Sequence, residues 1–272
     1  MGVAQSFAGN VVVVTGAAMG IGAAIAAAFA EAGGTVFGLD RDGPAMKQAA
    51  AGMAGMVHPW TLDVTDRDAV AAAFAEFHES KGRIDILVNN AGFGRGYLIE
   101  NMEPESWDEV VGVNLTGTFN CTRAAIPGMR DAGGGAIVNI ASVAGKRISF
   151  LGGADYTAAK SGVLGFTRHA AFELAQYGIR VNAICPGPVL TPLTINSTTD
   201  EKRDQVARTV PLGRWVQPRD IASAALFLAS PDAAMCTGTS LDVDGGIMVS
   251  NGTSYEDYMA RRGGTAQTKK AG

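Results

Sequence analysis

The chain has 272 residues, of which 47% are hydrophobic and 18% charged, and its formal net charge is −4. A chain of this length forms one large domain or two small ones, and its apolar fraction can fill a sizeable core. The acidic balance offers no electrostatic footprint for nucleic acid, so we expect a small-molecule substrate and no nucleic-acid partner.

Cysteine and histidine usage bears on compartment and metal binding. The cysteines are odd in number and form no C-x-x-C pair, which fits free thiols in a reducing compartment; they are Cys121, Cys185 and Cys236. The three histidines are scattered without ligand spacing, so we expect no metal. The N-terminus lacks the basic segment of a signal peptide, and we expect a cytoplasmic protein.

The first predicted elements are a strand, a glycine turn and a helix. The β-branched run 10–15 indicates a buried strand, and the alanine-rich run 23–32 indicates a helix. Between them stand Gly16, Gly20 and Gly22 in the spacing G-x-x-x-G-x-G. Such glycines let the backbone approach a pyrophosphate at a helix N-terminus, although glycine-rich turns also occur without a ligand.

The uncharged run 7–30 is long enough to cross a membrane, but it divides into this strand and helix, and we expect no membrane partner.

The next predicted strand, 35–39, ends in Asp40, eighteen positions after Gly22. An acidic residue at this distance accepts hydrogen bonds from the adenosine ribose hydroxyls and repels a 2′-phosphate. The pattern therefore favours NAD over NADP, and Arg41, which follows directly, would weaken that preference.

Strand and helix patterns alternate along the rest of the chain without a Pro/Ser-rich linker. This alternation favours one doubly wound α/β domain with a parallel sheet. The long predicted helix through Tyr177 opens with Tyr156 and Lys160, which share one helix face. A fixed positive neighbour lowers a phenol pKa by roughly 1–3 units, which would make Tyr156 a proton-transfer group near neutral pH.

Several ordered motifs then resemble those of the short-chain dehydrogenase/reductase family, in its compact single-domain branch, over residues 7 to about 249. The motifs are the cofactor loop 15–22, Asp63-Val64, the N-N-A-G run 89–92, Asn114, Ser142, the Y-x-x-x-K pair Tyr156 and Lys160, the P-G-x-x-x-T run 186–191, the P-L-G-R-W run 211–215 and the D-V-D-G-G run 242–246. The spacing from Ser142 to Tyr156 is one residue longer than the family pattern, which leaves the substrate preference open.

The resemblance implies a three-layer Rossmann-type fold with a seven-stranded parallel sheet in the order 3-2-1-4-5-6-7. It implies one domain over 1–249, with a substrate lid at about 191–215 whose helical segment runs from Thr194 to Val210. Residues 250–272 would extend beyond it as a partly frayed tail with a short helix around Tyr258. It also implies a homotetramer, or a homodimer, built through helices near 104–132 and 155–177.

The resemblance assigns roles residue by residue. The catalytic residues would be Asn114, Ser142, Tyr156 and Lys160, with Tyr156 as acid and base and Lys160 lowering its pKa. The cofactor-binding residues would be Gly16, Met19, Gly20, Ile21, Gly22, Asp40, Arg41, Asp63, Val64, Asn90, Ala91, Gly92, Tyr156, Lys160, Pro186, Gly187, Val189 and Thr191. The substrate pocket would be lined by Phe93, Ser142, Val143, Ala144, Phe150, Leu151, Leu190 and Leu193.

The expected function is NAD-dependent hydride transfer between the nicotinamide cofactor and a secondary alcohol or ketone. The apolar lining favours a hydrophobic substrate, such as a cyclic, aromatic, terpenoid or steroid-like alcohol. The main alternative is an NADPH-dependent 3-oxoacyl thioester reductase, which Asp40 argues against. An epimerase or dehydratase with tightly held NAD and a non-catalytic nucleotide-binding protein are further alternatives; the complete set of four catalytic residues weighs against the last.

Overall fold

The computed structural model describes residues 6–149, 151–250 and 253–263. Its centre is a seven-stranded sheet in the order β3-β2-β1-β4-β5-β6-β7, and every pairing between neighbouring strands is parallel. The predicted strand order and α/β class are therefore confirmed. Because the order reverses between β1 and β4, the carboxyl ends of these strands border the crevice where doubly wound sheets bind ligands.

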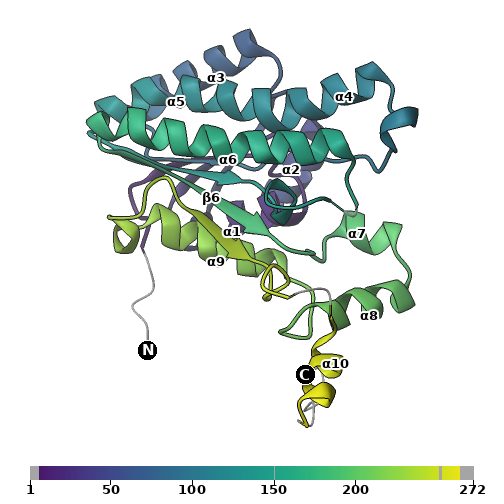
Figure 1. Ribbon diagram of the computed structural model, residues 1–272. Coiled ribbons are helices and arrows are strands. Elements are labelled where there is room, and N and C mark those ends of the chain that lie inside the picture. The colour runs from purple at the N-terminus through teal and green to yellow at the C-terminus, as the bar shows by residue number, and fades with distance from the viewer. Residues whose placement is uncertain (1–5, 150, 251–252, 264–272) are drawn as a thin grey trace.

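The helices and strands alternate through most of the chain (Figure 1). The strands are β1 Val11–Thr15, β2 Thr35–Asp40, β3 Met56–Thr61, β4 Ile86–Asn89, β5 Gly135–Ile140, β6 Ile179–Pro186 and β7 Ser240–Val243. The helices are α1 Gly20–Glu31, α2 Gly43–Ala51, α3 Arg67–Lys81, α4 Pro104–Val111, α5 Gly117–Asp131, α6 Ala154–Leu174, α7 Pro192–Ser197, α8 Asp200–Thr209, α9 Pro218–Ala229 and α10 Tyr255–Arg261.

Helices cover both faces of the sheet, so the molecule has three layers (Figure 1). Val12 and Val14 of β1 pack into the core shared with α1 and α9, whereas Val11 and Val13 pack into the core shared with α3 and α5. Alternate residues of one strand thus enter opposite cores. This explains why β1 reads as an unbroken apolar run, as expected of a parallel strand buried on both faces.

Two predicted segments differ from the structure. The helix expected over 23–32 begins earlier, at Gly20, because its first turn includes the last glycines of the turn. The helical segment expected from Thr194 to Val210 is two helices, α7 and α8, separated at Thr198 and Thr199. The Thr199 hydroxyl accepts a hydrogen bond from the Lys202 amide and caps the N-terminus of α8. The polar residues around Thr199 gave no sign in the sequence that a new helix begins there.

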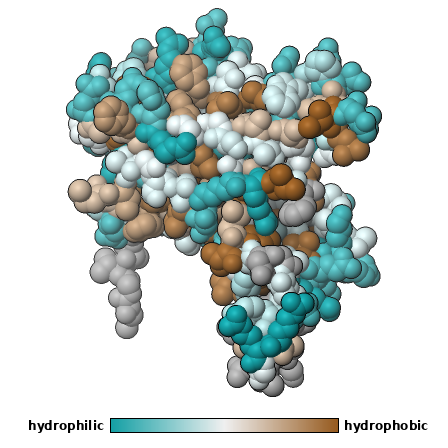
Figure 2. Space-filling view, in the orientation of Figure 1, coloured by the Kyte–Doolittle hydropathy of each residue, from teal (hydrophilic) through white to brown (hydrophobic). Residues whose placement is uncertain are grey.

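The helix expected beyond the sheet is present as α10, which projects below α8 in Figure 1. The remainder of the predicted tail, from residue 264 onward, lies outside the described residues. The face seen in Figure 2 is largely hydrophilic or neutral, with hydrophobic side chains gathered in small groups. Within the described part of the chain, no helix combines the length and apolar character needed to cross a bilayer.

Candidate active site

The turn after β1 is locked to the turn after β4 by backbone and side-chain hydrogen bonds. Thr15 Oγ1 accepts from the amides of Asn90 and Ala91 at 2.9 and 3.0 Å. Asn90 Nδ2 donates to the carbonyls of Thr15 and Gly16, each at 3.0 Å. Two predicted cofactor segments from distant parts of the sequence therefore form one rigid edge of the crevice.

The glycines of this turn are required by geometry. Gly16 and Gly20 have φ angles of +63° and +57°, in the left-handed region that favours glycine. A Cβ on Gly22 would lie 2.0 Å from the Gly16 carbonyl oxygen and 2.5 Å from Asn90 Nδ2. The start of α1 therefore packs directly on the turn, and the backbone around it forms a cradle that a larger residue would fill. Met19, at the N-cap, is exposed, and Ile21 packs toward the core.

Asp40 stands beside this cradle at the end of β2. Its carboxylate oxygens accept hydrogen bonds from the Ala18 amide at 3.1 Å and the Asp42 amide at 3.0 Å. The side chain is thus held against the glycine turn, where the sequence places the ribose acceptor. Arg41 is exposed and lies 3.8 Å from a carboxylate oxygen of Glu109 on α4.

The next two predicted cofactor residues differ in exposure. Asp63 is exposed and binds Thr65, whose amide and hydroxyl donate to one carboxylate oxygen at 2.8 and 2.7 Å. Val64 is buried, and its carbonyl accepts from Asn120 Nδ2 at 3.0 Å. Val64 also packs tightly on Gly117, so the segment after β3 is fixed to the start of α5.

The structure brings the four predicted catalytic residues together. Tyr156 and Lys160 lie one turn apart on α6, with Lys160 Nζ 5.5 Å from the centroid of the Tyr156 ring. Lys160 is buried and donates to the Ile140 carbonyl at 2.8 Å. Ser142 follows β5, and its side chain hydrogen-bonds with that of Tyr156. Its hydroxyl oxygen also accepts from the Ala144 amide at 3.0 Å, which fixes its direction.

Asn114 completes the group from a short π-helical turn, Gly112–Thr116, between α4 and α5. π-Helical insertions of this kind often mark functional sites. Asn114 Nδ2 donates to the Phe93 carbonyl at 2.7 Å and the Val110 carbonyl at 2.9 Å. A Cβ on Gly92 would lie 2.3 Å from Asn114 Oδ1 and 3.3 Å from Lys160 Nζ, so all three converge on one point.

The electrostatics of the tyrosine differ from the expectation. We expected Lys160 to lower the pKa of Tyr156, but desolvation by burial raises it in this structure, and hydrogen bonding with Ser142 opposes the rise. Burial also lowers the pKa of Lys160 to about 8. The physical reason is that both groups are withdrawn from water, and desolvation disfavours the charged form of each. In the chain alone, Tyr156 is therefore a protonated phenol, a proton donor.

Glycine backbone packs against the Tyr156 ring. A Cβ on Gly94 would lie 3.0 Å from the ring, and one on Gly152 would lie 2.8 Å from it. The loops after β4 and before α6 thus lie against the catalytic side chain. Two hollows, of about 400 and 370 Å³, lie elsewhere, at the end of β7 and between α3 and α5, and neither is lined by a catalytic residue.

The predicted pocket residues are spread more widely than the catalytic ones. Val143 and Ala144 stand directly after Ser142 in a short 3₁₀ turn. Leu151 and Leu193 are 61% and 70% exposed, so they do not form a closed apolar wall in this structure. Phe150 lies outside the described residues. Phe93 lies beneath the guanidinium groups of Arg41 and Arg95.

The segment after β6 connects the crevice to the predicted lid. Pro186 ends β6, and Gly187 packs so closely on Asp244 that a Cβ would lie 2.7 Å from its Cα. Val189 forms a parallel bridge with Val216, and the amide of Leu190 donates to the Val216 carbonyl at 2.9 Å. Thr191 caps α7 and lies next to Gly20, so the predicted lid begins in contact with the glycine turn.

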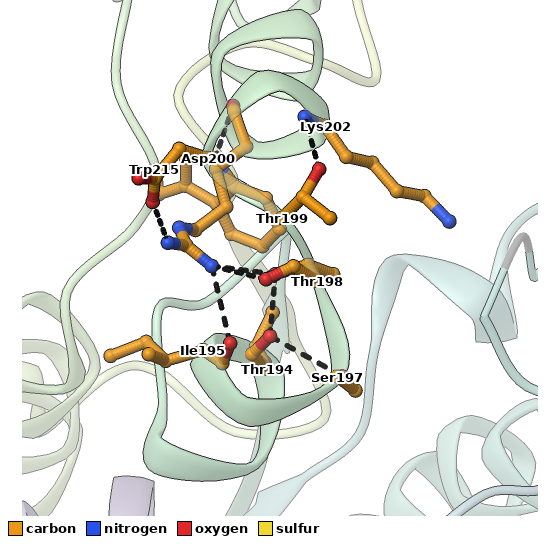
Figure 3. Close-up of polar contacts among 9 residues, drawn as sticks. Thr194, Ile195, Ser197, Thr198, Thr199, Asp200, Lys202 and Trp215 are labelled. Atoms are coloured by element: carbon orange, nitrogen blue, oxygen red, sulfur yellow. Dashed lines mark hydrogen bonds and ion pairs between the residues drawn. The ribbon is translucent and has the colours of Figure 1, made fainter.

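Arg203 on α8, which the sequence did not single out, is the centre of a hydrogen-bond network in the predicted lid. Its guanidinium donates to the carbonyls of Ile195 and Thr198 and pairs with Asp200. The indole of Trp215 donates to the Arg203 carbonyl at 2.8 Å. Figure 3 shows the α7 and α8 residues of this network facing one another across the Thr198–Thr199 junction. No motif marks an arginine that binds backbone carbonyls, so only the structure reveals it.

No group of three or more histidine, cysteine, aspartate or glutamate side chains is arranged for a metal ion among the described residues.

The family model described as "Enoyl-(Acyl carrier protein) reductase" matches residues 16–248 of the chain. The chain belongs to the short-chain dehydrogenase/reductase family. The family assignment is therefore supported by a match over most of the chain and agrees with the motifs and the sheet order.

Similar proteins include two enzymes and one solved structure. The 3-oxoacyl-[acyl-carrier-protein] reductase FabG of Thermotoga maritima is 41% identical over 244 residues, 89% of this chain and 98% of that protein. The D-threitol dehydrogenase of Mycolicibacterium smegmatis is 41% identical over 244 residues, 89% of this chain and 94% of that protein. The structure of a 3-oxoacyl-[acyl-carrier protein] reductase from Brucella melitensis matches with 39% identity and a TM-score of 0.82, covering 89% of this chain and 92% of that one.

Proposed function

We propose that this oxidoreductase reduces the 3-oxo group of an acyl thioester to the hydroxyl, with NADH as the hydride donor. The observation that carries the reaction type is the meeting of Tyr156, Ser142 and Lys160 beside the glycine turn. The names of the similar reductases support the thioester class, which was the alternative at the level of sequence. They give no support to a cyclic or steroid-like alcohol.

The cofactor fits the residues that are present. The cradle around Gly16 and Gly22 suits a pyrophosphate, and the fixed Asp40 carboxylate suits the two ribose hydroxyls rather than a 2′-phosphate. Ala91 and Gly92 would border the nicotinamide half, with Pro186 to Thr191 on the other side. When bound, the reduced nicotinamide supplies the hydride, while the protein orients and binds.

The four catalytic residues would handle the proton. Tyr156, whose raised pKa keeps it protonated, donates to the carbonyl oxygen as that oxygen gains negative charge. The Ser142 hydroxyl, held by Ala144, hydrogen-bonds the same oxygen and polarises it. Lys160, with a pKa near 8, can return a proton toward the tyrosine. Asn114, which donates to the Phe93 carbonyl, would fix the segment after β4 beside Lys160.

The oxidation of a secondary alcohol with NAD is the second candidate. The fixed Asp40 carboxylate favours NAD, the usual oxidant in such reactions, and the similar D-threitol dehydrogenase bears the name of a polyol enzyme. We also propose a homo-oligomer, because Phe119 on α5 and Phe172 on α6 expose 44% and 86% of their surfaces on the helices that the family uses for assembly.

The test is a matrix of cofactors and substrates followed by the absorbance of reduced nicotinamide. NADH and NADPH would each be paired with acetoacetyl-CoA, and NAD with threitol and a set of cyclic and aromatic alcohols. The proposal predicts the highest kcat/KM for NADH with acetoacetyl-CoA. Turnover restricted to free alcohols would favour the second candidate, and turnover restricted to NADPH would show that Asp40 does not exclude the 2′-phosphate.

A further inference from the structure

Glu109 on α4 binds two arginines from different segments of the cofactor crevice. Its carboxylate oxygens lie 2.6 Å from Arg95 Nη2 and 3.8 Å from Arg41 Nη1. Both guanidinium groups also lie over the Phe93 ring, with their central carbons 5.8 Å (Arg41) and 5.1 Å (Arg95) from its centroid. Contacts of this length are typical of cation–π interactions. One carboxylate and one ring therefore hold both arginines.

The position of Arg41 gives this cluster its significance. Arg41 directly follows Asp40 at the carboxyl end of β2, whereas Phe93 and Arg95 follow β4. Arg41 thus reaches across the crevice, from the strand that would meet the adenosine ribose to the helix on the opposite wall. Arg95 is further fixed by Ser106, whose hydroxyl accepts a hydrogen bond from Arg95 Nη1 at 3.1 Å. In this Arg41–Glu109–Arg95 bridge, Arg95 is therefore held more firmly than Arg41.

Arg41 is the cation next to the position where a 2′-phosphate would stand. A free guanidinium there would bind a phosphate through charge-assisted hydrogen bonds and would offset the repulsion from Asp40. Glu109 competes for the same guanidinium and adds a negative charge of its own. Both effects disfavour NADPH and leave NADH almost untouched, because NADH lacks the phosphate.

We propose that Glu109 is a specificity-determining residue that strengthens the discrimination against NADPH by holding Arg41 away from the 2′-phosphate. It is a positioning residue, since its larger effect passes through Arg41 and its own charge adds the smaller one. The inference rests on the proposed placement of the adenosine ribose at Asp40, but it does not depend on the identity of the carbonyl substrate.

The bridge also extends toward the chemistry. The Phe93 carbonyl accepts a hydrogen bond from Asn114, and the backbone of Gly94 packs on the Tyr156 ring. Phe93, whose ring lies under both arginines, is therefore followed directly by the residue that packs on the catalytic tyrosine. This proximity means that activity alone would mix two effects of a Glu109 variant, so the test must measure binding.

The experiment is a fluorescence titration of the purified protein with NADH and with NADPH, without any substrate. In Glu109→Gln, the ratio of the NADPH Kd to the NADH Kd should fall roughly three- to tenfold. A change of this size is expected from losing the exposed Glu109–Arg41 ion pair and the repulsion between Glu109 and the 2′-phosphate. Glu105→Gln is the matched control, with the same charge change one turn earlier on α4. Glu105 makes no ion pair within the part of the chain that the structure describes, and its ratio should change less than about twofold.

A second background makes the route testable. If Glu109 acts through Arg41, Glu109→Gln should have much less effect on the ratio in an Arg41→Ala protein. An equal effect in that background, or an equal change in both dissociation constants, would overturn the inference. Failure of both dinucleotides to bind wild type would overturn the proposed function along with it, whereas normal NADH binding with an unchanged ratio in Glu109→Gln would overturn this inference alone.

Discussion

The predicted cofactor edge of the crevice and the predicted lid, residues 191–215, are held in different ways. At the edge, the turn around Gly16 and Gly22 is fixed by hydrogen bonds from the Asn90 side chain to backbone carbonyls and by contacts so close that only glycine fits. In the lid, α7 and α8 are held by one arginine side chain and by exposed polar caps. From this difference we expect cofactor binding to depend on rigid backbone in the first region and substrate access to depend on side-chain contacts that can open in the second.

Among the variants that compare these two regions, the largest effect is expected at the cofactor edge, from Gly22→Ala. The new Cβ would meet backbone oxygen at 2.0 Å, so the turn or α1 must shift. We expect the NADH Kd to rise at least about tenfold and the free energy of unfolding to fall by roughly 1–3 kcal/mol, as for overpacked sites. Dinucleotide titration and urea unfolding measure the two effects.

Gly165→Ala on α6 is the matched control for Gly22→Ala. A Cβ on Gly165 would meet only the end of the Arg168 side chain at 3.8 Å. Alanine is the better helix former, so this variant should gain about 0.5–1 kcal/mol of stability and bind NADH normally. Normal NADH binding by Gly22→Ala would contradict the account of a rigid edge.

A second prediction sharpens the role of burial beside that edge. The pKa of Lys160 in the folded chain, about 8, is below the ordinary value of 10.5. Between these values the unfolded chain binds more protons, so this group makes stability rise with pH and removes that stability as pH falls toward 8. Lys160→Met should therefore gain stability relative to wild type by about 2 kcal/mol as pH is lowered from 10 to 8.

Urea unfolding of both proteins across this pH range provides the measurement. Burial raises the pKa values of Cys121 and Cys185 to about 12 and 11, which opposes the trend in each protein. The Cys121 contribution cancels in the difference between the two proteins, whereas Cys185 interacts with Lys160, so the comparison is made in a Cys185→Ala background. A difference that does not vary with pH would show that Lys160 keeps its ordinary pKa in the folded chain.

The smallest effect is expected in the lid, from Arg203→Ala. Loss of the guanidinium frees two backbone carbonyls at the junction of α7 and α8. We expect the substrate KM to change by roughly three- to tenfold, with cofactor Kd unchanged and faster proteolysis of the lid. Arg208→Ala is the control, because Arg208 is exposed at the end of the same helix. Equal changes in both variants would argue against the role of Arg203 in holding α7 and α8 together.

These regions also differ in how well sequence predicts them. The cofactor edge was predictable because Gly16 to Gly22, Asp40 and Asn90 act through backbone geometry and hydrogen bonds, which fix both residue type and spacing. The strand order followed from the family resemblance and is confirmed. The division of the lid at Thr199, the Arg203 network and the Glu109 bridge depend on which distant side chains meet, and no local pattern encodes that.

The pKa of Tyr156 was mispredicted for a related reason. The i, i+4 spacing correctly placed Lys160 on the same face of α6, but spacing carries no information about burial. Desolvation by burial raises the Tyr156 pKa and exceeds the opposing effect of the Ser142 hydrogen bond in the folded chain. The exposed positions of Leu151 and Leu193 also differ from the apolar wall that their residue types suggested.

The most direct test of the account compares Tyr156→Phe with wild type in two assays on the same preparations, NADH binding and turnover with NADH and acetoacetyl-CoA. The phenol supplies a proton and does not build the glycine cradle, so binding should stay within about twofold while kcat falls by roughly 10²–10⁴-fold. A variant that binds NADH and keeps more than about a tenth of wild-type turnover would contradict the assignment of Tyr156 as the proton donor.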